Sequence, residues 1–329
     1  RQRAFPHGAI KTESHRLMLA QATAKEREAA LARAGGEKSA ALTTTWTQTG
    51  PTNIGGRVSD LAIHPADADV VYAGLATGGV IKTTDGGQTW TPILQDLDAI
   101  SIGDLALDPQ DPDVLYVGTG EANAASLSVF GNGLYRSPDG GATWEHLGLA
   151  ESVYIARVLV DPTNSQRLFV AATGRLFGTD QNRGVYRSLD AGASWDRVFA
   201  LTDSTACTDL VMHPTDPDIV YAAMWERVRG LTYRRSGGPS SGIWRSLDGG
   251  DTWSELTSGL PTGNDVGRIG LTVCESEPDR LYAIYADASA GFEGVYTSGD
   301  GGDTWTGTND WNLSSIYSSF GWYFGQVRV

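Results

Sequence analysis

The sequence is poor in cysteine. Its 329 residues include only two, Cys207 and Cys274. Two cysteines form neither a disulfide framework nor a zinc site built from cysteines alone. Because the two occupy non-equivalent positions in neighbouring repeats, we expect two free thiols, and a single disulfide between them is the alternative.

The sequence is also short of positive charge and of long apolar segments. It has 25 lysines and arginines against 39 aspartates and glutamates, which gives a formal net charge of −14. Proteins that bind nucleic acid place clustered basic side chains against phosphates, so this balance argues against a nucleic-acid partner. No apolar run approaches the length of a membrane-spanning helix, which argues against membrane insertion.

Glycine and one repeated phrase are abundant instead. The chain has 41 glycines, and the phrase "SLDGGDTW" at 246–253 occurs in five related copies. The aspartates of successive copies lie 51 to 58 residues apart, which is the period expected of a four-stranded propeller blade. The aspartates are Asp85, Asp139, Asp190, Asp248 and Asp300, and the tryptophans that close the copies are Trp90, Trp144, Trp195, Trp253 and Trp305.

The segments between these copies predict the strands of each blade. In the first repeat, alternating or apolar segments at 57–65, 70–76, 78–84 and 89–94 are typical of four strands separated by turn residues. Later repeats keep this spacing. The predicted fold class is therefore all-β, a β-propeller of four-stranded blades over residues 43–329 with five full blades.

Two partial blades frame the repeats. Residues 43–50 resemble a fourth strand without its first three, and residues 325–329 resemble a first strand without the next three. A propeller protects its open edge when the N-terminal strand completes the last blade. We therefore expect 43–50 to close the ring, at least six blades in total, and further domains of the same chain beyond Val329.

A short arm precedes the propeller. Within residues 1–42, the segment 10–34 is rich in strong helix formers, and Gly35 and Gly36 follow it. We expect a partly helical arm that lies as a strap on the outside of the propeller; a processed pro-segment or a partner-binding arm is the alternative. No signal peptide is visible and the chain begins at Arg1 without methionine, which leaves secretion open.

The repeated phrase is predicted to be a structural turn. An aspartate followed by two glycines suits a tight turn in which the carboxylate accepts backbone N–H groups and the glycines adopt positive φ. The alternative is a calcium loop, but calcium takes about six to eight oxygen ligands and the repeated aspartate supplies one carboxylate per turn. We therefore expect no metal and no cofactor, with Ca²⁺ kept as the alternative.

The motif S/T-x-D-x-G-x-T/S-W, as in "SPDGGATW" (137–144), resembles the Asp-box, or BNR repeat, of sialidases, sortilin-type propellers and xyloglucanase-like glycoside hydrolases. The words "GPTNIGGRVSDLAIHP" and "SIGDLALDPQDPDVLYVGTGEAN" are most similar to secreted bacterial proteins that carry a sortilin N-terminal-type propeller and are frequently termed glycosyl hydrolase-like. The resemblance implies an exported or cell-surface protein with several domains. The resemblance is strong evidence for the fold and weak evidence for a catalytic activity, because one fold can carry many functions.

Neither catalytic template of these families transfers to this sequence. Xyloglucanase-like enzymes carry a catalytic aspartate in a "TDxGG" word on the second strand, whereas the matching stretch here is "LATGGVIK", with Thr77 before Gly78. The arginine triad, tyrosine and glutamate of sialidases form no recognisable set, although Arg57 follows "IGG". A catalytic role therefore rests on other residues, if there is one.

The long insertions all connect the second and third strands of their blades, so we expect them to share one face, the long-loop face. They are residues 119–133, 173–184, 224–242 and 285–294. Variable loops on a rigid scaffold carry function more often than the turns that build it. We therefore predict that a ligand binds at this face.

The third insertion carries the most chemistry. Within eleven residues it contains Trp225, Glu226, Arg227, Arg229, Tyr233, Arg234 and Arg235, and Asn123 lies in the insertion of the second blade. Guanidinium groups form paired hydrogen bonds with carboxylates, and Trp, Tyr and Arg side chains are frequent at binding sites. This set therefore predicts a surface, the arginine wall, that binds an anion such as a peptide terminus or an acidic glycan. An interblade or interdomain salt-bridge cluster is the alternative. For an enzyme, Glu121, Glu226 and Asp287 are the candidate catalytic carboxylates.

A second set of residues is predicted to line the central channel. Aligned first strands place Asp60, Asp104, Arg157 and Asp209 at one equivalent position. Either these groups meet in the channel, with raised carboxylate pKa values or a bound cation, or each bonds the backbone of the next blade. We favour the second interpretation.

Taken as a whole, the sequence predicts a secreted or cell-surface Asp-box propeller that binds a protein or a glycan through its long-loop face. A glycoside hydrolase and a purely structural module of a larger protein are the alternatives. The aromatic segment 311–325 is predicted to be either a partner surface or an interblade connection folded into the core.

Overall fold

The computed structural model describes residues 56–94, 99–123, 128–308, 312–317 and 320–329. Of the N-terminal arm it describes only Gln21, Ala24, Lys25 and Arg27, which are helical. The rest of the predicted arm and the predicted closing strand 43–50 lie outside the described residues. Among the helices that are described, none is long and apolar enough to cross a membrane.

The described residues form five antiparallel sheets of four strands each. Blade 1 contains β1 (Val58–Ile63), β2 (Val71–Leu75), β3 (Gly79–Thr83) and β4 (Thr91–Pro92). Blade 2 contains β5 (Ile102–Leu107), β6 (Leu115–Thr119), β7 (Leu134–Ser137) and β8 (Glu145–His146). Blade 3 contains β9 (Ile155–Asp161), β10 (Asn164–Ala172), β11 (Gly184–Ser188) and β12 (Asp196–Phe199).

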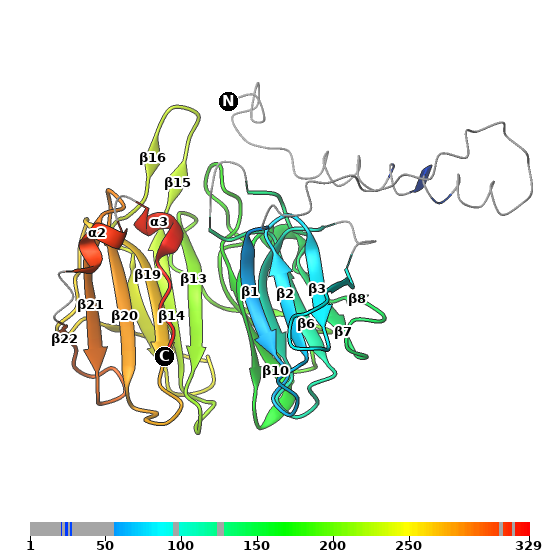
Figure 1. The fold of residues 1–329 in the computed structure, drawn as a ribbon. Coiled ribbons are helices and arrows are strands. Elements are labelled where there is room, and N and C mark those ends of the chain that lie inside the picture. The colour runs from blue at the N-terminus through cyan, green and yellow to red at the C-terminus, as the bar shows by residue number, and fades with distance from the viewer. Residues whose placement is uncertain are drawn as a thin grey trace, which may run out of the picture.

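Blade 4 contains β13 (Thr205–Met212), β14 (Val220–Glu226), β17 (Gly242–Ser246) and β18 (Ser254–Leu256). Blade 5 contains β19 (Val266–Val273), β20 (Leu281–Asp287), β21 (Phe292–Ser298) and β22 (Thr306–Gly307). A separate hairpin of β15 (Val228–Arg229) and β16 (Arg234–Arg235) rises from blade 4 (Figure 1). The short helices are η1 (Ala150–Ser152), α2 (Leu313–Tyr317) and α3 (Gly321–Phe324).

The blades pack in chain order through their first strands. β1 contacts β5, β5 contacts β9, β9 contacts β13, and β13 contacts β19. Figure 1 shows residues 325–329 running beside β19, and a Cβ built on Gly270 of that strand would fall 2.4 Å from the Gly325 carbonyl oxygen. The architecture confirms the prediction of an all-β propeller of four-stranded blades. The total number of blades stays a prediction.

Aromatic side chains on the second strands fill the space between blades. Tyr72, Tyr116, Phe169 and Tyr221 are each at most 1% exposed. The Tyr221 hydroxyl donates a hydrogen bond of 2.8 Å to the carbonyl oxygen of Gly301 in the next Asp-box. The equivalent Tyr282 of blade 5 is only partly buried, because no further Asp-box turn follows it within the described residues.

Small residues let the first strands approach the preceding blade closely. A Cβ on Gly118 of β6 would lie 2.5 Å from Cγ2 of Ile155, and a Cβ on Gly74 of β2 would lie 2.6 Å from Cγ2 of Ile102. Both isoleucines are fully buried. The cysteines do not contribute a cross-link, since Cys207 and Cys274 are free, as predicted.

Each Asp-box is a closed network of local hydrogen bonds. In all five, the first-position Ser or Thr hydroxyl donates to one carboxylate oxygen at 2.7–2.8 Å. The hydroxyl four residues after the aspartate donates to the other oxygen at 2.6 Å. Both glycines of "DGG" adopt positive φ, for example 67° at Gly249 and 92° at Gly250. The structure therefore shows the predicted turn.

The same turns also join neighbouring blades. Lys82 of blade 1 donates to the Gly140 carbonyl oxygen at 3.1 Å, and Arg187 and Arg245 donate to the Gly249 and Gly301 carbonyl oxygens at 2.7 Å. In two boxes the tryptophan bonds backward as well: the Trp144 and Trp195 indoles donate to carbonyl oxygens of blades 1 and 2. The repeated phrase is thus a joint between blades.

The Asp-box carboxylates predict a defined acid sensitivity. Hydrogen bonds from Thr252 and Ser246 lower the pKa of Asp248 from 3.8 to about 2. A depressed carboxyl pKa contributes stability that is present above the unfolded value, near pH 4, and is lost as the pH falls through about 2. We expect Asp248→Asn to lower the melting temperature at neutral pH, and this deficit to shrink between pH 4 and pH 2. Thermal melts across this window test it. Glu275→Gln, an exposed site, is the control, and a constant deficit would contradict the assignment.

The close packing at Gly118 predicts a second effect. Gly118→Ala would place a methyl group against Ile155, and overpacking of this kind costs about 1–3 kcal/mol. The matched control is Gly299→Ala, because nothing lies within 4 Å of a Cβ built there. Urea unfolding should show the loss for the first variant and almost none for the second. Equal stabilities for the two variants would refute this account of blade packing.

Candidate functional site

The long-loop face is built by the connections between second and third strands, with two corrections to the predicted insertions. β14 extends through Glu226, so Trp225 and Glu226 belong to the end of a strand and not to a loop. β20 extends to Asp287 and β21 starts at Phe292, which reduces the predicted insertion 285–294 to a short turn. Both corrections have one reason: the backbone pairing of these strands continues beyond the repeat's common length.

A pocket of about 20 Å³ lies on this face, where blades 2, 3 and 4 meet. This volume accommodates roughly one water molecule. The lining residues are Glu121, Ala122, Tyr154, Thr173, Gly174, Arg175, Leu176, Arg183, Ala206, Thr208, Trp225 and Arg227. The pocket therefore joins predicted site residues of the fourth blade to side chains of the second and third.

Arg227 is the centre of a positively charged cluster. Its side chain lies over the Trp225 ring at 5.0 Å and the residue is only 6% exposed. Burial lowers the pKa of Arg227 well below its ordinary value, and the neighbouring charges of Arg229, Arg183, Arg268 and Arg234 lower it further. The chain thus concentrates guanidinium groups at one place although its net charge is −14.

Arg183 fixes the loops around this cluster. Its guanidinium donates to the carbonyl oxygens of Ser204, Arg227, Arg175 and Gly178. Burial lowers the pKa of Arg183 to about 10. Because these four carbonyl groups come from three separate segments, Arg183 holds the third-blade loop against the base of the β15–β16 hairpin.

The hairpin carries the other predicted arginines. The exposed Arg235 forms an ion pair with Glu226, whose carboxylate also accepts a hydrogen bond of 2.8 Å from the Ser240 hydroxyl. The hairpin turn presents Tyr233, which is 63% exposed. The Arg229 guanidinium lies over the Phe177 ring at 5.6 Å. Glu226 therefore acts within the cluster as a partner of Arg235.

Glu121 connects the second blade to α3, and Asn123 connects it to Arg268 of β19. The Glu121 carboxylate is buried, forms an ion pair with Arg57, and accepts hydrogen bonds from the Ser128 hydroxyl at 3.2 Å and the Tyr323 hydroxyl at 3.0 Å. The Asn123 side-chain oxygen accepts a hydrogen bond of 3.1 Å from Arg268. Burial and the charge of Glu121 raise the pKa of Tyr323 to about 12.

The three candidate catalytic carboxylates belong to separate networks. Glu121 bonds Arg57, Ser128 and Tyr323, and Glu226 bonds Arg235 and Ser240. Asp287 accepts the backbone N–H groups of Ser289 and Gly291, so it closes its own turn. No two of these carboxylates share a hydrogen-bonding or ion-pair partner among the contacts given above. Within the described residues, no group of three or more His, Cys, Asp or Glu side chains is placed to bind a metal ion.

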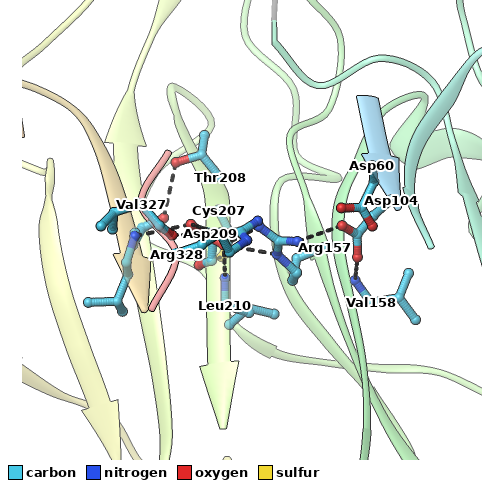
Figure 2. A network of polar contacts seen from close by, with 12 residues as sticks. Asp60, Asp104, Arg157, Val158, Cys207, Thr208, Asp209, Leu210, Val327 and Arg328 are labelled. Carbon is cyan, nitrogen blue, oxygen red and sulfur yellow. Dashed lines mark hydrogen bonds and ion pairs between the residues drawn. The ribbon is translucent and has the colours of Figure 1, made fainter. Parts of the chain in front are cut away.

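The channel residues combine both interpretations of the sequence (Figure 2). Asp60, Asp104 and Asp209 each accept a backbone N–H of the following blade, from Leu105, Val158 and Leu271 respectively. In addition, Arg157 donates to Asp104 at 2.7 Å and to Asp209 at 2.9 Å, and Arg328 lies 4.0 Å from Asp209. The four aligned residues therefore hold blades together and also form a charge network.

Burial dominates the electrostatics of this network. It raises the pKa of the Asp104 carboxyl; the charge of Asp60 adds to the effect and that of Arg157 opposes it. Burial also disfavours the charged form of Arg157, but the carboxylates of Asp104, Asp209 and Asp60 outweigh it and raise the pKa of Arg157. The Arg157 guanidinium thus stays charged, and its charge offsets part of the cost of burying the carboxylates of Asp104 and Asp209.

Sequence reasoning missed several residues of the long-loop face. Arg183, Arg268 and Tyr323 were not singled out, yet each makes contacts that organise the site. Arg268 had a weak signal, because it interrupts the apolar strand β19. Tyr323 lies in the aromatic segment 311–325 that the sequence marked, but its bond to Glu121 had no signal, since the two residues lie 202 positions apart in the chain.

Comparisons with known proteins agree with this architecture. The family model Sortilin-Vps10, described as sortilin, neurotensin receptor 3, matches residues 132–263. A xyloglucanase from Paenibacillus sp is 28% identical over 213 residues, covering 56% of this chain and 18% of that protein. A vacuolar protein sorting/targeting protein 10 from Colletotrichum graminicola is 30% identical over 112 residues, covering 34% of this chain and 6% of that protein.

Solved structures show the same fold. An ancestral GH74 enzyme superposes with a TM-score of 0.62 at 22% identity, covering 80% of this chain and 32% of that chain. The GH74 xyloglucanase from Xanthomonas campestris gives 0.56 at 23% identity, covering 77% and 38%. The resemblance to sortilin-like and glycosyl hydrolase-like Asp-box propellers is confirmed. The chain spans 18–24% of the length of the curated xyloglucanases that it matches.

The Arg157 network predicts a large, pH-dependent stability effect. Arg157→Met would leave Asp104 and Asp209 buried without their shared partner, which costs about 3–5 kcal/mol at neutral pH. The loss should shrink as the pH falls towards 5, because the raised pKa lets Asp104 take up a proton. Urea unfolding at both pH values measures this. The double variant Arg157→Met/Asp104→Asn should recover part of the loss, and a loss that is independent of pH and not recovered would refute the network.

Proposed function

We propose that this chain is a binding module that recognises an anionic ligand through its long-loop face. The observation that carries the proposal is the environment of Arg227, a buried guanidinium that lies over the Trp225 ring at 5.0 Å and whose pKa is lowered by burial and further by four surrounding arginines. Like charges at a partly desolvated site raise the free energy of the unliganded face. A bound carboxylate would offset this repulsion and accept charge-assisted hydrogen bonds.

The overall charge of the chain supports the same ligand class. With a net charge of −14, most of the surface repels an anion, and electrostatic complementarity favours approach to the arginine cluster. Exposed Arg234 and Arg235 and half-buried Arg229 flank the deeper Arg227. The proposed ligand therefore approaches the hairpin first and the pocket second.

The aromatic side chains favour a charged ligand over a neutral sugar. Arg227 lies over Trp225, Arg229 over Phe177 and Arg234 over Trp322, at 5.0–5.6 Å from the ring centroids. These ring faces are already in cation–π contact, which leaves less of their area for a sugar to stack on. Both a protein and an acidic glycan supply the required carboxylates.

A glycoside hydrolase is the second candidate, favoured by the similarity to xyloglucanases. Such enzymes need two carboxylates separated by about 5–5.5 Å for retention or about 6.5–9.5 Å for inversion. Glu121, Glu226 and Asp287 are each engaged in a different network. The position that carries the family's aspartate is occupied by exposed Thr77. We therefore place hydrolysis second.

A structural role in a larger protein is the third candidate. Val58, Leu61 and Ile63 of β1 are 47–59% exposed, whereas Ile102 and Leu105, at the equivalent positions of Val58 and Leu61, are at most 6% exposed. Another blade packed on β1 would cover these side chains, which supports further domains of the same chain beyond Val329. We also propose that the protein is secreted or displayed on the cell surface.

The proposed binding is tested with three labelled probes: an oligoglutamate peptide, an oligogalacturonate and a xyloglucan oligosaccharide. We expect a carboxylated probe to bind, and Arg234→Ala/Arg235→Ala to weaken it by about 10- to 100-fold, since hydrogen bonds to charged groups contribute about 1.5–3 kcal/mol. Added salt should weaken binding as well. Fluorescence polarisation gives the affinities, and released sugar is assayed in the same samples.

The control is Arg280→Ala, which removes an arginine from the opposite face. This face, the short-turn face, is formed by the turns between first and second strands, such as the one from β19 to β20, and by the Asp-box turns between third and fourth strands. The two carboxylated probes separate a protein ligand from a glycan ligand. Sugar release that Glu226→Gln abolishes would replace this proposal by the hydrolase. Equal affinities of the double variant and the control would remove the arginine wall as the binding surface, and no binding of any probe would leave the structural role.

A further inference from the structure

The helix α3 (Gly321–Phe324) lies across the long-loop face. The Tyr323 hydroxyl donates to Glu121 of blade 2 at 3.0 Å, and the Gly321 N–H donates to the Ala290 carbonyl oxygen of blade 5 at 3.0 Å. Arg268 of β19 donates to the carbonyl oxygens of Trp322 and Tyr323 at 3.0 and 3.2 Å. This short helix therefore connects blade 5 to blade 2 on the face proposed to bind a ligand.

Two rings of α3 also cover arginines of this face. The Arg234 guanidinium lies 5.6 Å from the Trp322 ring centroid, and that of Arg57 lies 5.6 Å from the Tyr323 ring centroid. The same Arg268 that bonds the α3 carbonyl oxygens also bonds Asn123. The helix thus uses as its own partners the basic groups that a bound anion would need.

The pocket lies beside α3, because Glu121, which accepts the hydrogen bond from Tyr323, is one of its lining residues. It measures about 20 Å³, enough for roughly one water molecule, although Glu121, Trp225 and Arg227 line it. A ligand larger than a water molecule would therefore also contact the side chains around the pocket, among them Arg234, whose guanidinium lies over the Trp322 ring of α3.

The attachment of α3 suits a segment that can be displaced. It is a single helical turn of four residues, and a helix of that length has no stability of its own in water. Its position depends on the polar and cation–π contacts given above and on the packing of Trp322 against the core cluster that contains Leu176 and Trp225, and both Trp322 and Tyr323 are only partly buried. Loss of any one of these contacts therefore shifts the equilibrium towards the displaced state.

We propose that α3 is a displaceable lid over the arginine cluster, so that an anionic ligand binds in competition with it. The inference rests on the proposed binding function, and it adds the regulation of the same site. When a binding-competent state is only partly populated, the apparent affinity falls by the fraction that is competent. Weakening the lid contacts therefore raises the apparent affinity without changing any ligand contact.

Two variants weaken the lid without altering the arginines. Tyr323→Phe removes only the hydroxyl that bonds Glu121, and Trp322→Ala removes the ring that covers Arg234. We expect the oligoglutamate peptide to bind each variant about five- to ten-fold more tightly than the unaltered chain. Amide hydrogen exchange of Gly321 and Tyr323, whose N–H groups bond Ala290 and Phe320, should accelerate in both. Tyr282→Phe, at the short-turn end of blade 5, is the control for loss of a tyrosine hydroxyl.

Hydrogen exchange separates failure of the lid from failure of the binding function, because it needs no ligand. Faster exchange with unchanged peptide affinity would overturn the lid and leave the binding function standing. Weaker binding in both variants would make α3 a part of the binding surface, which also overturns the lid. Faster exchange without binding of peptide to any form would overturn the proposed function and the lid with it.

Discussion

The packing of the blades depends on one repeated hydrogen bond, accepted by the carbonyl oxygen of the first glycine in the second, fourth and fifth Asp-boxes: Gly140, Gly249 and Gly301. The positive φ of this glycine turns its carbonyl outward, where a lysine or arginine of the preceding blade donates to it, as Arg187 does at Gly249 and Arg245 at Gly301. The aspartate's own hydrogen bonds hold the turn in this conformation. A short motif with local contacts therefore determines how large sheets stack.

Hydrogen bonds between neighbouring blades also hold the inner edge of the propeller, and there side-chain carboxylates accept them. In blades 1, 2 and 4 one carboxylate accepts a backbone N–H of the next blade, as Asp104 does from Val158. A β-bulge precedes each of these aspartates in the pairing of β1, β5 and β13, and bulges re-aim side chains. Arg157 departs from the pattern, and its charge holds two buried aspartates that are 105 residues apart in the sequence. Because Arg157 replaces an aspartate at this position, the separate interblade hydrogen bonds of Asp104 and Asp209 become parts of one charge network.

The sequence predicted those features of the fold that recur in every repeat. Five copies of the Asp-box predicted the blades, their strands and the joint role of the turn, because equivalent positions in each copy face the same neighbours. Non-repeated contacts had no such signal. Trp225 and Glu226 were assigned to a loop because the extra length of β14 has no parallel in blade 1. The bond from Tyr323 to Glu121 joins segments that only the ring brings together, so no local pattern could reveal it.

Rigidity and adjustability are divided between the two faces. On the short-turn face, box residues are bonded to the next blade by charged donors to backbone oxygens, which leaves little freedom to move. On the long-loop face, Arg227, Arg229 and Arg234 lie over aromatic rings. Such cation–π contacts are weaker and less directional than hydrogen bonds from a charged donor to a backbone oxygen. A guanidinium that lies over Trp322 can therefore turn to a carboxylate at low cost, while Arg183, bound to four carbonyl oxygens, keeps the surrounding loops in place. On the face proposed to bind an anion, Arg234 thus supplies a donor that can turn towards a ligand, and Arg183 keeps the loops around that donor fixed.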